Sequence, residues 1–347
     1  MVKLTFISNR LAKKHSTGTF HPESPHRIDV IEEWIQSQTH ENVGYELLDQ
    51  SASREDILLI HSADHYNLIE KTQGYTGHFH FDADTAANSY TFKAATQAVA
   101  VGKKAILEST VNSSIFALVR PPGHHATRTS PGGFCIFNNI AIAAELVLHE
   151  KKYDRVAIID FDHHFGNGTA YIHEKNPNIL YISTHADPRI SYPGCGFVEE
   201  IGEAEGRGYN ISIPLGYRSS EADIKFAFEE LILPVIQQFQ PNFLAISAGF
   251  DAFEKDPIGV LGVTSEGFSM IGAYILKISS ELNIPFANFL EGGYNIYSLP
   301  KLISSYISPF IQDDQERNYY DISLHPNDQT IATVNRAKNI LSDYWQL

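Results

Sequence analysis

The sequence predicts an α/β fold in which one open, parallel β-sheet is flanked by helices. Short apolar runs rich in β-branched residues alternate with longer stretches of helical periodicity. Several of these runs are almost continuously hydrophobic, as strands covered by helices on both faces must be. No glycine- or serine-rich linker and no break in composition divides the chain, so we expect a single domain over residues 1–347.

Seven strands and three long helices are predicted from these patterns. The strands are LTFIS (4–8), SIFALVR (114–120), RVAIIDF (155–161), ILYIST (179–184), YNISIPL (209–215), FLAISAGF (243–250) and PFANFLEGG (285–293). The helices cover residues 138–152, 220–239 and 264–282, where apolar residues recur at helical spacing. The last two begin with serine or threonine, which commonly cap helix N-termini.

The charge balance limits the classes of partner. Lysine and arginine number 26 against 41 aspartate and glutamate residues, a net charge of −15 at neutral pH. Such a field repels phosphate backbones and attracts cations, so we expect no direct contact with nucleic acid and favour positively charged substrates.

Cysteine usage and the N-terminus indicate the compartment. Cys135 and Cys195 are the only cysteines and form no CxxC pair, so neither a disulfide framework nor a thiolate zinc site is expected. The N-terminal apolar run is too short for a signal peptide, and no later run is long enough to span a bilayer. We therefore expect a cytoplasmic protein without a membrane partner.

Aspartate and histidine residues, which can bind metal ions, follow two of the predicted strands. In an open parallel sheet, ligands bind beyond the carboxyl ends of the strands. Asp162 and His164 lie two residues apart after one strand, so strand alternation points them the same way, and Asp251 follows another. With three ligands, one position of a tetrahedral ion stays open for water or substrate. Taken singly, an Asp-x-His pair is also compatible with a hydrogen-bonded loop anchor.

Two further strand ends carry groups suited to proton transfer. His124 and His125 follow the strand at 114–120, and Tyr294 follows the strand at 285–293. The histidine pair alone is compatible with a metal site, a base or surface residues, and the glycine-rich segment before Tyr294 alone with a simple turn. Their joint placement at one edge of the sheet favours an active site.

The segments themselves resemble a known family. RPPGHHATRTSPGGFCIFNN, IDFDHHFGNGT, SAGFDAFEKDP and LEGGYN look like the signature blocks of zinc-dependent histone deacetylases and acetylpolyamine amidohydrolases. The likeness runs in family order from HPESPHRI through FDADT, YPGCG and GYNISIPL, so it covers nearly the whole chain. It implies an arginase/deacetylase-like fold and a bacterial-type amidohydrolase that removes short acyl groups.

The resemblance implies specific roles at the site. One catalytic Zn²⁺ is implied at Asp162, His164 and Asp251, where it would polarise the acyl carbonyl and acidify a bound water. The implied catalytic residues are the paired histidines, the tyrosine opposite them as an oxyanion donor, and two residues that orient the pair: His124, His125, Tyr294, Asp160 and Asn167. We take His125 as the base and His124 as the group that assists the leaving amine, although the sequence leaves this assignment open.

Further positions carry over from the same family. A structural K⁺ is implied at Asp160, Asp162, His164, Ser183 and Thr184, partly through backbone carbonyls. The substrate-binding positions are Gly133, Phe134, Tyr192, Asp82 and Ile258, with the aromatics as walls of a narrow acyl tunnel. Asp82 would grip the substrate backbone at the rim. Asp84 is an equally reachable candidate, and a solvated turn acid is the alternative role for Asp82.

The pattern departs from the family at the proposed metal site. Family members usually have a second histidine directly after the ligand, whereas this chain reads His163-His164-Phe165. Alignment on Asp160, Asp162 and the following GNG makes His164 the ligand and turns His163 away from the metal. His163 stays the rival ligand.

The expected function is deacetylation of lysine side chains in peptides or proteins. Acetylated polyamines are the alternative substrate, because HADPRISYP and FEKDPI look like the polyamine enzymes. The chain lacks the long insertion before FDADT that those enzymes use to narrow the entrance, which favours lysine. A binuclear arginase-like site and a non-catalytic acyl-lysine binder are the other classes considered, and an oligomer is compatible with the sequence.

Overall fold

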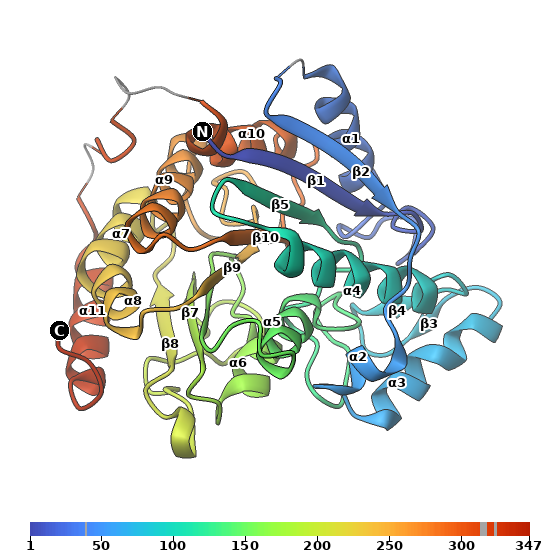
Figure 1. Ribbon diagram of the computed structural model, residues 1–347, viewed down its shortest axis with the longest axis horizontal. Coiled ribbons are helices and arrows are strands. Elements are labelled where there is room, and N and C mark those ends of the chain that lie inside the picture. Colours follow the sequence, from blue (N-terminus) through green and yellow to red (C-terminus); the bar gives the residue numbers. More distant parts are fainter. Residues whose placement is uncertain (39, 313–317, 323–324) are drawn as a thin grey trace.

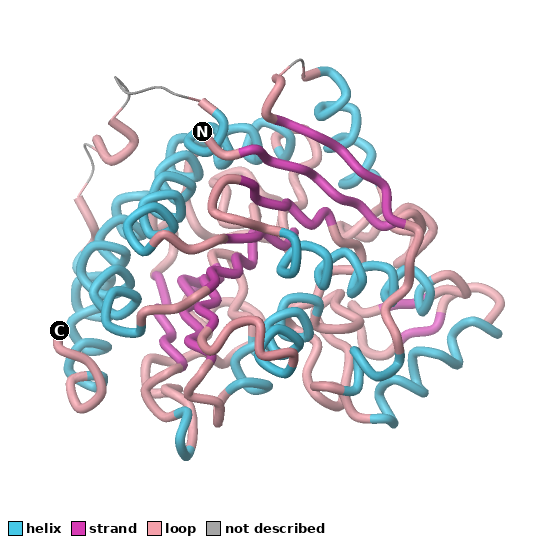
Figure 2. Tube along the Cα trace, viewed as in Figure 1, coloured by secondary structure: helices cyan, strands magenta, loops and turns pink. Residues whose placement is uncertain are grey.

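The central feature of the fold is a parallel sheet, as the sequence predicts. A computed structural model describes residues 1–38, 40–312, 318–322 and 325–347. Within them, eight parallel strands pair in the order β2-β1-β5-β10-β9-β6-β7-β8 (Figures 1 and 2). Their bounds are β1 (Lys3–Asn9), β2 (Val43–Leu48), β5 (Ser113–Leu118), β6 (Val156–Asp160), β7 (Ile179–Ala186), β8 (Asn210–Leu215), β9 (Phe243–Ala248) and β10 (Phe286–Leu290). A separate short hairpin is formed by β3 (Phe79–His80) and β4 (Ala86–Ala87).

Helices cover both faces of the sheet. Their bounds are α1 (His26–Ser37), α2 (Arg54–Leu58), α3 (Ala63–Glu70), α4 (Thr91–Glu108), α5 (Asn139–His149), α6 (Asn167–His173), α7 (Glu221–Ala227), α8 (Leu233–Phe239), α9 (Ser265–Leu282), α10 (Leu299–Ile311) and α11 (Asp328–Leu341). Two short 3₁₀ turns, η1 (Lys71–Gly74) and η2 (Ala204–Gly206), and a π-helical turn, η3 (Phe228–Ile232), complete the regular structure. None of the helices in the described ranges has the length and apolar character needed to cross a bilayer.

Strand alternation divides the interior into two main cores. Phe116 and Leu118 of β5 face the core shared with α1 and α7 to α11, whereas Ile115 and Ala117 face the core shared with α4 and α5. Figure 1 shows these two groups of helices on opposite sides of the strands. Burial on both faces explains why the predicted strands are continuously hydrophobic.

The seven predicted strands are present, and β2 and the two-residue strands β3 and β4 were missed. Residues of β2 are only partly buried, since it lies at the sheet edge beside β1, so its sequence lacks a long apolar run. The predicted helix at 220–239 is continuous with one change of winding, because α7 passes through the π-helical turn η3 into α8. Ser220 and Thr264 cap α7 and α9 as predicted.

The strand order gathers the predicted site residues. β5, β10, β9 and β6 are consecutive neighbours in the sheet. They are also the four strands after which the sequence places histidine, tyrosine and carboxylate groups. All four run in parallel, so their carboxyl ends open on the same edge, where a ligand site is expected.

Candidate functional site

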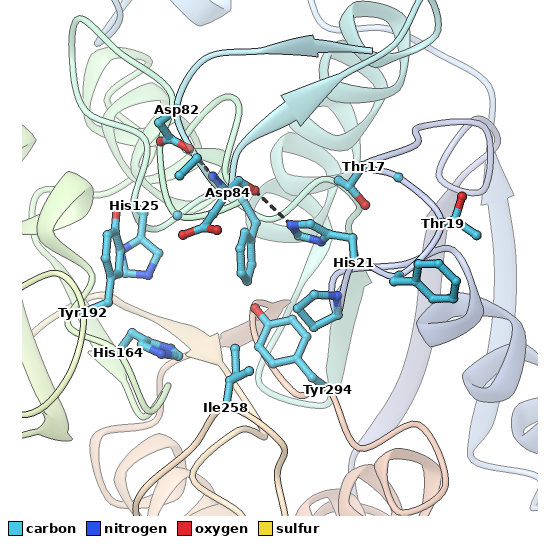
Figure 3. Close-up of a pocket in the computed structure, with 16 residues that line it drawn as sticks. Thr17, Thr19, His21, Asp82, Asp84, His125, His164, Tyr192, Ile258 and Tyr294 are labelled. Carbon is cyan, nitrogen blue, oxygen red and sulfur yellow. Dashed lines mark hydrogen bonds between the residues drawn. The ribbon is translucent and has the colours of Figure 1, made fainter. Parts of the chain in front are cut away.

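The carboxyl ends of these four strands surround one cavity. Its volume is about 770 Å³, within the range usual for small-ligand pockets. His125, His164 and Tyr294 lie on its inner wall (Figure 3). The cavity is lined by Thr17, Gly18, Thr19, Phe20, His21, Pro22, Asp82, Ala83, Asp84, His125, Gly133, Phe134, His164, Tyr192, Ile258 and Tyr294.

Asp162, His164 and Asp251 converge at the base of the cavity. Their ligand atoms all lie within 4.8 Å of one another. His164 Nδ1 is 3.1 Å from Asp251 Oδ2 and 3.3 Å from Asp162 Oδ1. Two carboxylates and one imidazole, with His164 exposed to the cavity, can hold a divalent metal and leave one position for a ligand.

Two glycines, Gly249 and Gly292, bring the backbone into direct contact with these carboxylates. A Cβ atom at Gly249 would lie 2.0 Å from Asp162 Oδ2, and one at Gly292 would lie 2.1 Å from Asp251 Oδ2. Such contacts are far inside van der Waals separation, so only glycine lets the two strand ends approach the ligands this closely.

His163 points away from the metal-ligand cluster. Its Nε2 lies 3.3 Å from Ser191 Oγ, and its backbone N–H donates to Asp251 Oδ1. The structure therefore groups His164, rather than His163, with the two carboxylates. Phe165, at the position of the usual second histidine, packs its ring 4.7 Å from that of His185.

The paired histidines have different partners and different pKa values. His124 Nδ1 donates to Asp160 Oδ2 at 3.0 Å, and His125 Nδ1 donates to Asn167 Oδ1 at 2.8 Å. Burial disfavours the charged form of His124, but Asp162 and Asp160 outweigh burial and raise the pKa of His124 to about 10. Burial and the charge on His124 lower the pKa of His125 well below its usual value. These shifts favour the charged form of His124 and the neutral form of His125.

The hydrogen bond of His125 also sets its tautomer. Because the Asn167 oxygen accepts, the proton of neutral His125 resides on Nδ1. The Nε2 lone pair is then free to take a proton in the cavity. Asp160 is held in turn by the hydroxyl of Tyr181, which donates to Oδ2 at 2.9 Å.

Tyr294 lies at the cavity wall with its ring against Phe134. The two ring centroids are 5.7 Å apart, edge to face, and Tyr294 is 9% exposed. Burial raises the pKa of Tyr294 well above its usual value, so the hydroxyl stays protonated and can donate a hydrogen bond.

Aromatic rings and backbone form the channel walls. The Tyr192 ring centroid is 4.9 Å from that of His125 and Tyr192 is 49% exposed, so it reaches from the interior to solvent. Gly133 passes so close to His125 that a Cβ atom would lie 2.4 Å from its ring. Ile258 contributes an apolar side chain to the same cavity.

The two rim aspartates behave differently. Asp82 Oδ1 accepts the backbone N–H groups of Asp84 and Thr85 and so closes the turn of the β3–β4 hairpin. The Asp84 carboxylate points into the cavity in Figure 3 and has no hydrogen-bond or salt-bridge partner among the described residues. Asp82 thus closes the turn with one carboxylate oxygen while still lining the cavity, and both oxygens of Asp84 are free within the described part of the chain.

An N-terminal rim loop was missed by the sequence reasoning. His21 Nε2 donates to the backbone oxygen of Asp84 at 2.9 Å, while its Nδ1 accepts the N–H of Glu23. Its ring lies 4.6 Å from that of Phe134. The available signal was position, because this loop leaves the carboxyl end of β1, next to β5. Residues 17–22 all line the cavity.

Comparisons with known proteins identify the family and support the fold. Residues 21–309 match a family model described as histone deacetylase domain. The chain is 33% identical over 346 residues to histone deacetylase 10, chloroplastic, of Oryza sativa subsp. japonica, covering 93% of this chain and 77% of that protein. A probable deacetylase of Archaeoglobus fulgidus is 33% identical over 288 residues, 82% of this chain and 79% of the relative. The crystal structure of the HDA15 HD domain is similar with a TM-score of 0.88 and 29% identity, covering 99% of this chain and 95% of that one.

Proposed function

The chain belongs to the histone deacetylase family, and we propose that it is a zinc-dependent enzyme that hydrolyses N-acetyl and other short acyl amides of lysine side chains. One observation carries the proposal. A three-ligand cluster, a neutral histidine with a free ring nitrogen and a protonated tyrosine surround the same cavity. Metal-assisted amide hydrolysis uses all three, a metal to activate water and carbonyl, a base to take the proton and a donor to stabilise the oxyanion.

The donor set fits zinc. Asp162, His164 and Asp251 supply two oxygens and one nitrogen, and the close approach of Gly249 and Gly292 leaves the cluster enclosed except toward the cavity. Zinc held there supplies a Lewis acid for the acyl carbonyl and acidifies the attacking water.

The protein groups divide the proton transfers between them. His125 Nε2 takes the proton of the attacking water, because the lowered pKa keeps the ring neutral and the proton on Nδ1, bound to Asn167, leaves the Nε2 lone pair available. His124, which is cationic beside Asp160, donates a proton to the leaving amine. The Tyr294 hydroxyl donates a hydrogen bond to the oxyanion that develops on the acyl carbon.

The channel suits an aliphatic stem that ends in an amide. Phe134, Tyr192 and Ile258 provide apolar walls for the methylene groups of lysine. Asp84 supplies a negative charge, and no lysine or arginine is among the residues that line the cavity. The acidic cavity also supports acetylated polyamines as the second candidate substrate, because they carry additional ammonium groups.

A monovalent cation near Asp160 is a further part of the proposal. The register of β6 and β7 pairs Asp160 with Ser183, which brings oxygen atoms of the two strands together, and Thr184 follows in β7. Oxygen ligands of this kind suit K⁺. Dialysis against Na⁺ and K⁺ buffers, followed by thermal unfolding, tests whether the choice of ion changes stability.

Assay of the zinc-loaded enzyme on an acetyl-lysine peptide and on acetylspermidine, with wild type beside Tyr294→Phe, tests the function. We expect faster hydrolysis of the peptide by wild type and a loss on the order of 10²- to 10³-fold in kcat for the variant. A large rate advantage for acetylspermidine would reverse the substrate order. Unchanged turnover in Tyr294→Phe would refute the mechanism, and absence of both zinc and turnover would favour a binding protein.

A further inference from the structure

The loop that carries Tyr294 is held by side chains through its backbone. Arg27 donates Nε to the carbonyl oxygen of Gly293 at 2.7 Å and Nη2 to that of Glu291. Gly292 N–H donates to Asp162 Oδ2 at 2.7 Å. These contacts fix the start of the loop but none of them reaches the backbone of Tyr294.

Asp256 binds the backbone N–H groups of the next two residues of the loop. Its Oδ2 accepts the backbone N–H of Tyr294 at 2.7 Å and that of Asn295 at 3.1 Å. Its Oδ1 accepts the N–H of Ile258 at 3.1 Å. One buried carboxylate therefore binds the backbone of both Tyr294 and a residue of the channel wall.

Asp256 has no ion-pair partner among the described residues, and the hydrogen bonds to its carboxylate there all come from backbone amides. Amide donors to a carboxylate are stronger than those to a neutral acceptor. A second contact joins the same two loops, since Asn295 Nδ2 donates to the backbone oxygen of Lys255 at 2.8 Å. The loop after β9, which begins with Asp251, is thereby tied to the loop after β10.

This tie matters because Tyr294 follows two glycines. Gly293 has a φ of +117°, so the preceding backbone has few steric restraints of its own. The hydroxyl must lie within hydrogen-bond reach of an oxyanion, and a displacement of about 1 Å in such a geometry costs on the order of 10²-fold in rate. A fixed Tyr294 amide removes that freedom.

We propose that Asp256 is a positioning residue that sets the placement of the Tyr294 hydroxyl. The proposal rests on the proposed function, in which that hydroxyl stabilises the oxyanion. Asp256 itself contacts neither the substrate nor the reacting atoms. Its effect on turnover therefore passes through Tyr294 and disappears when the hydroxyl is absent.

A double-mutant cycle with Asp256→Ala and Tyr294→Phe tests this dependence. We expect Asp256→Ala to lower kcat by roughly 10- to 100-fold, to change KM by less than about twofold and to retain bound zinc. In the Tyr294→Phe background, the same substitution should change kcat by less than about twofold. Metal content and thermal unfolding are measured for all four proteins.

Asp223→Ala is the matched control. Asp223 is also a buried carboxylate that accepts backbone N–H groups of two segments, those of Ser220 and Asn327, but it lies outside the cavity. We expect this variant to unfold at a lower temperature with kcat unchanged. A fall in kcat equal to that of Asp256→Ala would show a general effect of lost stability and overturn the proposal.

Asp256→Asn gives a second variant with the same volume and one accepting oxygen. It is expected to fold and to show part of the kcat loss. The asparagine oxygen can still accept from one side, but its NH₂ group would face the N–H donors on the other side and cannot accept from them. Unchanged kcat in either Asp256 variant overturns the proposal, as does an equal loss with and without the Tyr294 hydroxyl. If Tyr294→Phe alone left kcat unchanged, that result would instead overturn the proposed function.

Discussion

The floor and the rim of the cavity are built in different ways. The floor comprises Asp162, His164, Asp251, the histidine pair and Tyr294, which follow central strands and are buried except for the His164 side chain, which is 12% exposed. The rim comprises residues 17–22, residues 82–84 and Tyr192, which belong to loops. Phe20 in the rim is 99% exposed.

From this difference we infer that the floor carries out the reaction and the rim selects the substrate. The floor groups follow strands, and the histidine pair is also held by side-chain hydrogen bonds, as His125 is by Asn167, so its geometry is set before substrate arrives. The rim is tied by few bonds, such as that between His21 and Asp84, and can change without moving the metal ligands. We therefore expect floor substitutions to alter kcat and rim substitutions to alter the choice of substrate.

Removal of a metal ligand should have the largest effect. His164→Ala is expected to lose zinc and to lower kcat/KM by on the order of 10³-fold or more, because a Lewis acid contributes several kcal/mol. His163→Ala is the control, since that side chain faces Ser191, and it should keep its zinc. Metal analysis of both proteins checks which histidine is the ligand. Zinc loss from the His163 variant alone would make His163 the ligand instead of His164.

Loss of the support for His125 should have the next largest effect. Asn167→Ala leaves the His125 Nδ1 proton without its acceptor, so both tautomers become populated. Groups of this kind are worth about 10- to 100-fold in activity, and we expect a loss of that size in kcat with little change in KM. Steady-state kinetics at neutral pH measure it, and unchanged kcat would mean that the floor does not depend on this bond.

Acid should lower the free energy of unfolding through His65, a buried histidine of α3. Burial lowers the pKa of His65 to about 4 from an unfolded value near 6.5, so the unfolded chain takes up the proton first and stability is lost as pH falls below 6.5. Between pH 6.5 and 5 this amounts to about 2 kcal/mol.

Urea unfolding at pH 7 and pH 5 tests this linkage. His65→Phe should lose less stability on acidification than wild type by about that amount. His26→Gln, which changes a histidine with a largely exposed side chain, serves as the control and should follow wild type. Equal acid sensitivity of wild type and His65→Phe would assign the loss to other groups.

The rim aspartates should give the smallest effect and the clearest selectivity. Asp84→Asn is expected to lower kcat/KM by roughly fivefold for acetyl-lysine peptides with neighbouring arginines, and to leave peptides with neutral neighbours unchanged. The loss should shrink as ionic strength rises. Asp82→Asn keeps an oxygen that can close the turn and should discriminate less. Equal losses for both peptide types would exclude charge recognition by Asp84.

Most of the floor was predictable from the sequence because its signals are local. Continuous apolar runs reveal buried parallel strands, and polar residues directly after such runs lie at one edge of the sheet. Asp162, His164 and Asp251 follow from this rule, and the resemblance supplied their partners. The edge strand β2 escaped because its half-buried residues show no such run.

The rim and the support of Tyr294 were less predictable because they depend on bonds between distant segments. Asp82 and Asp84 both line the cavity, and which of them keeps both carboxylate oxygens free is decided by which one closes the hairpin turn. Asp256 binds backbone amides 38 and 39 residues further along the chain, and a backbone amide has no signature in the sequence. Side-chain identity alone does not reveal such pairs.

The glycines beside the carboxylates make the metal site vulnerable to a single methyl group. Alanine at Gly292 would put carbon within 2.1 Å of Asp251 Oδ2 and 2.6 Å of Asp162 Oδ2, so both ligands would have to turn away. Metal binding could therefore be lost with every ligand still in the sequence. We therefore expect natural variants at Gly249 or Gly292 to lose metal binding, although glycine has no side chain that could itself bind a metal ion.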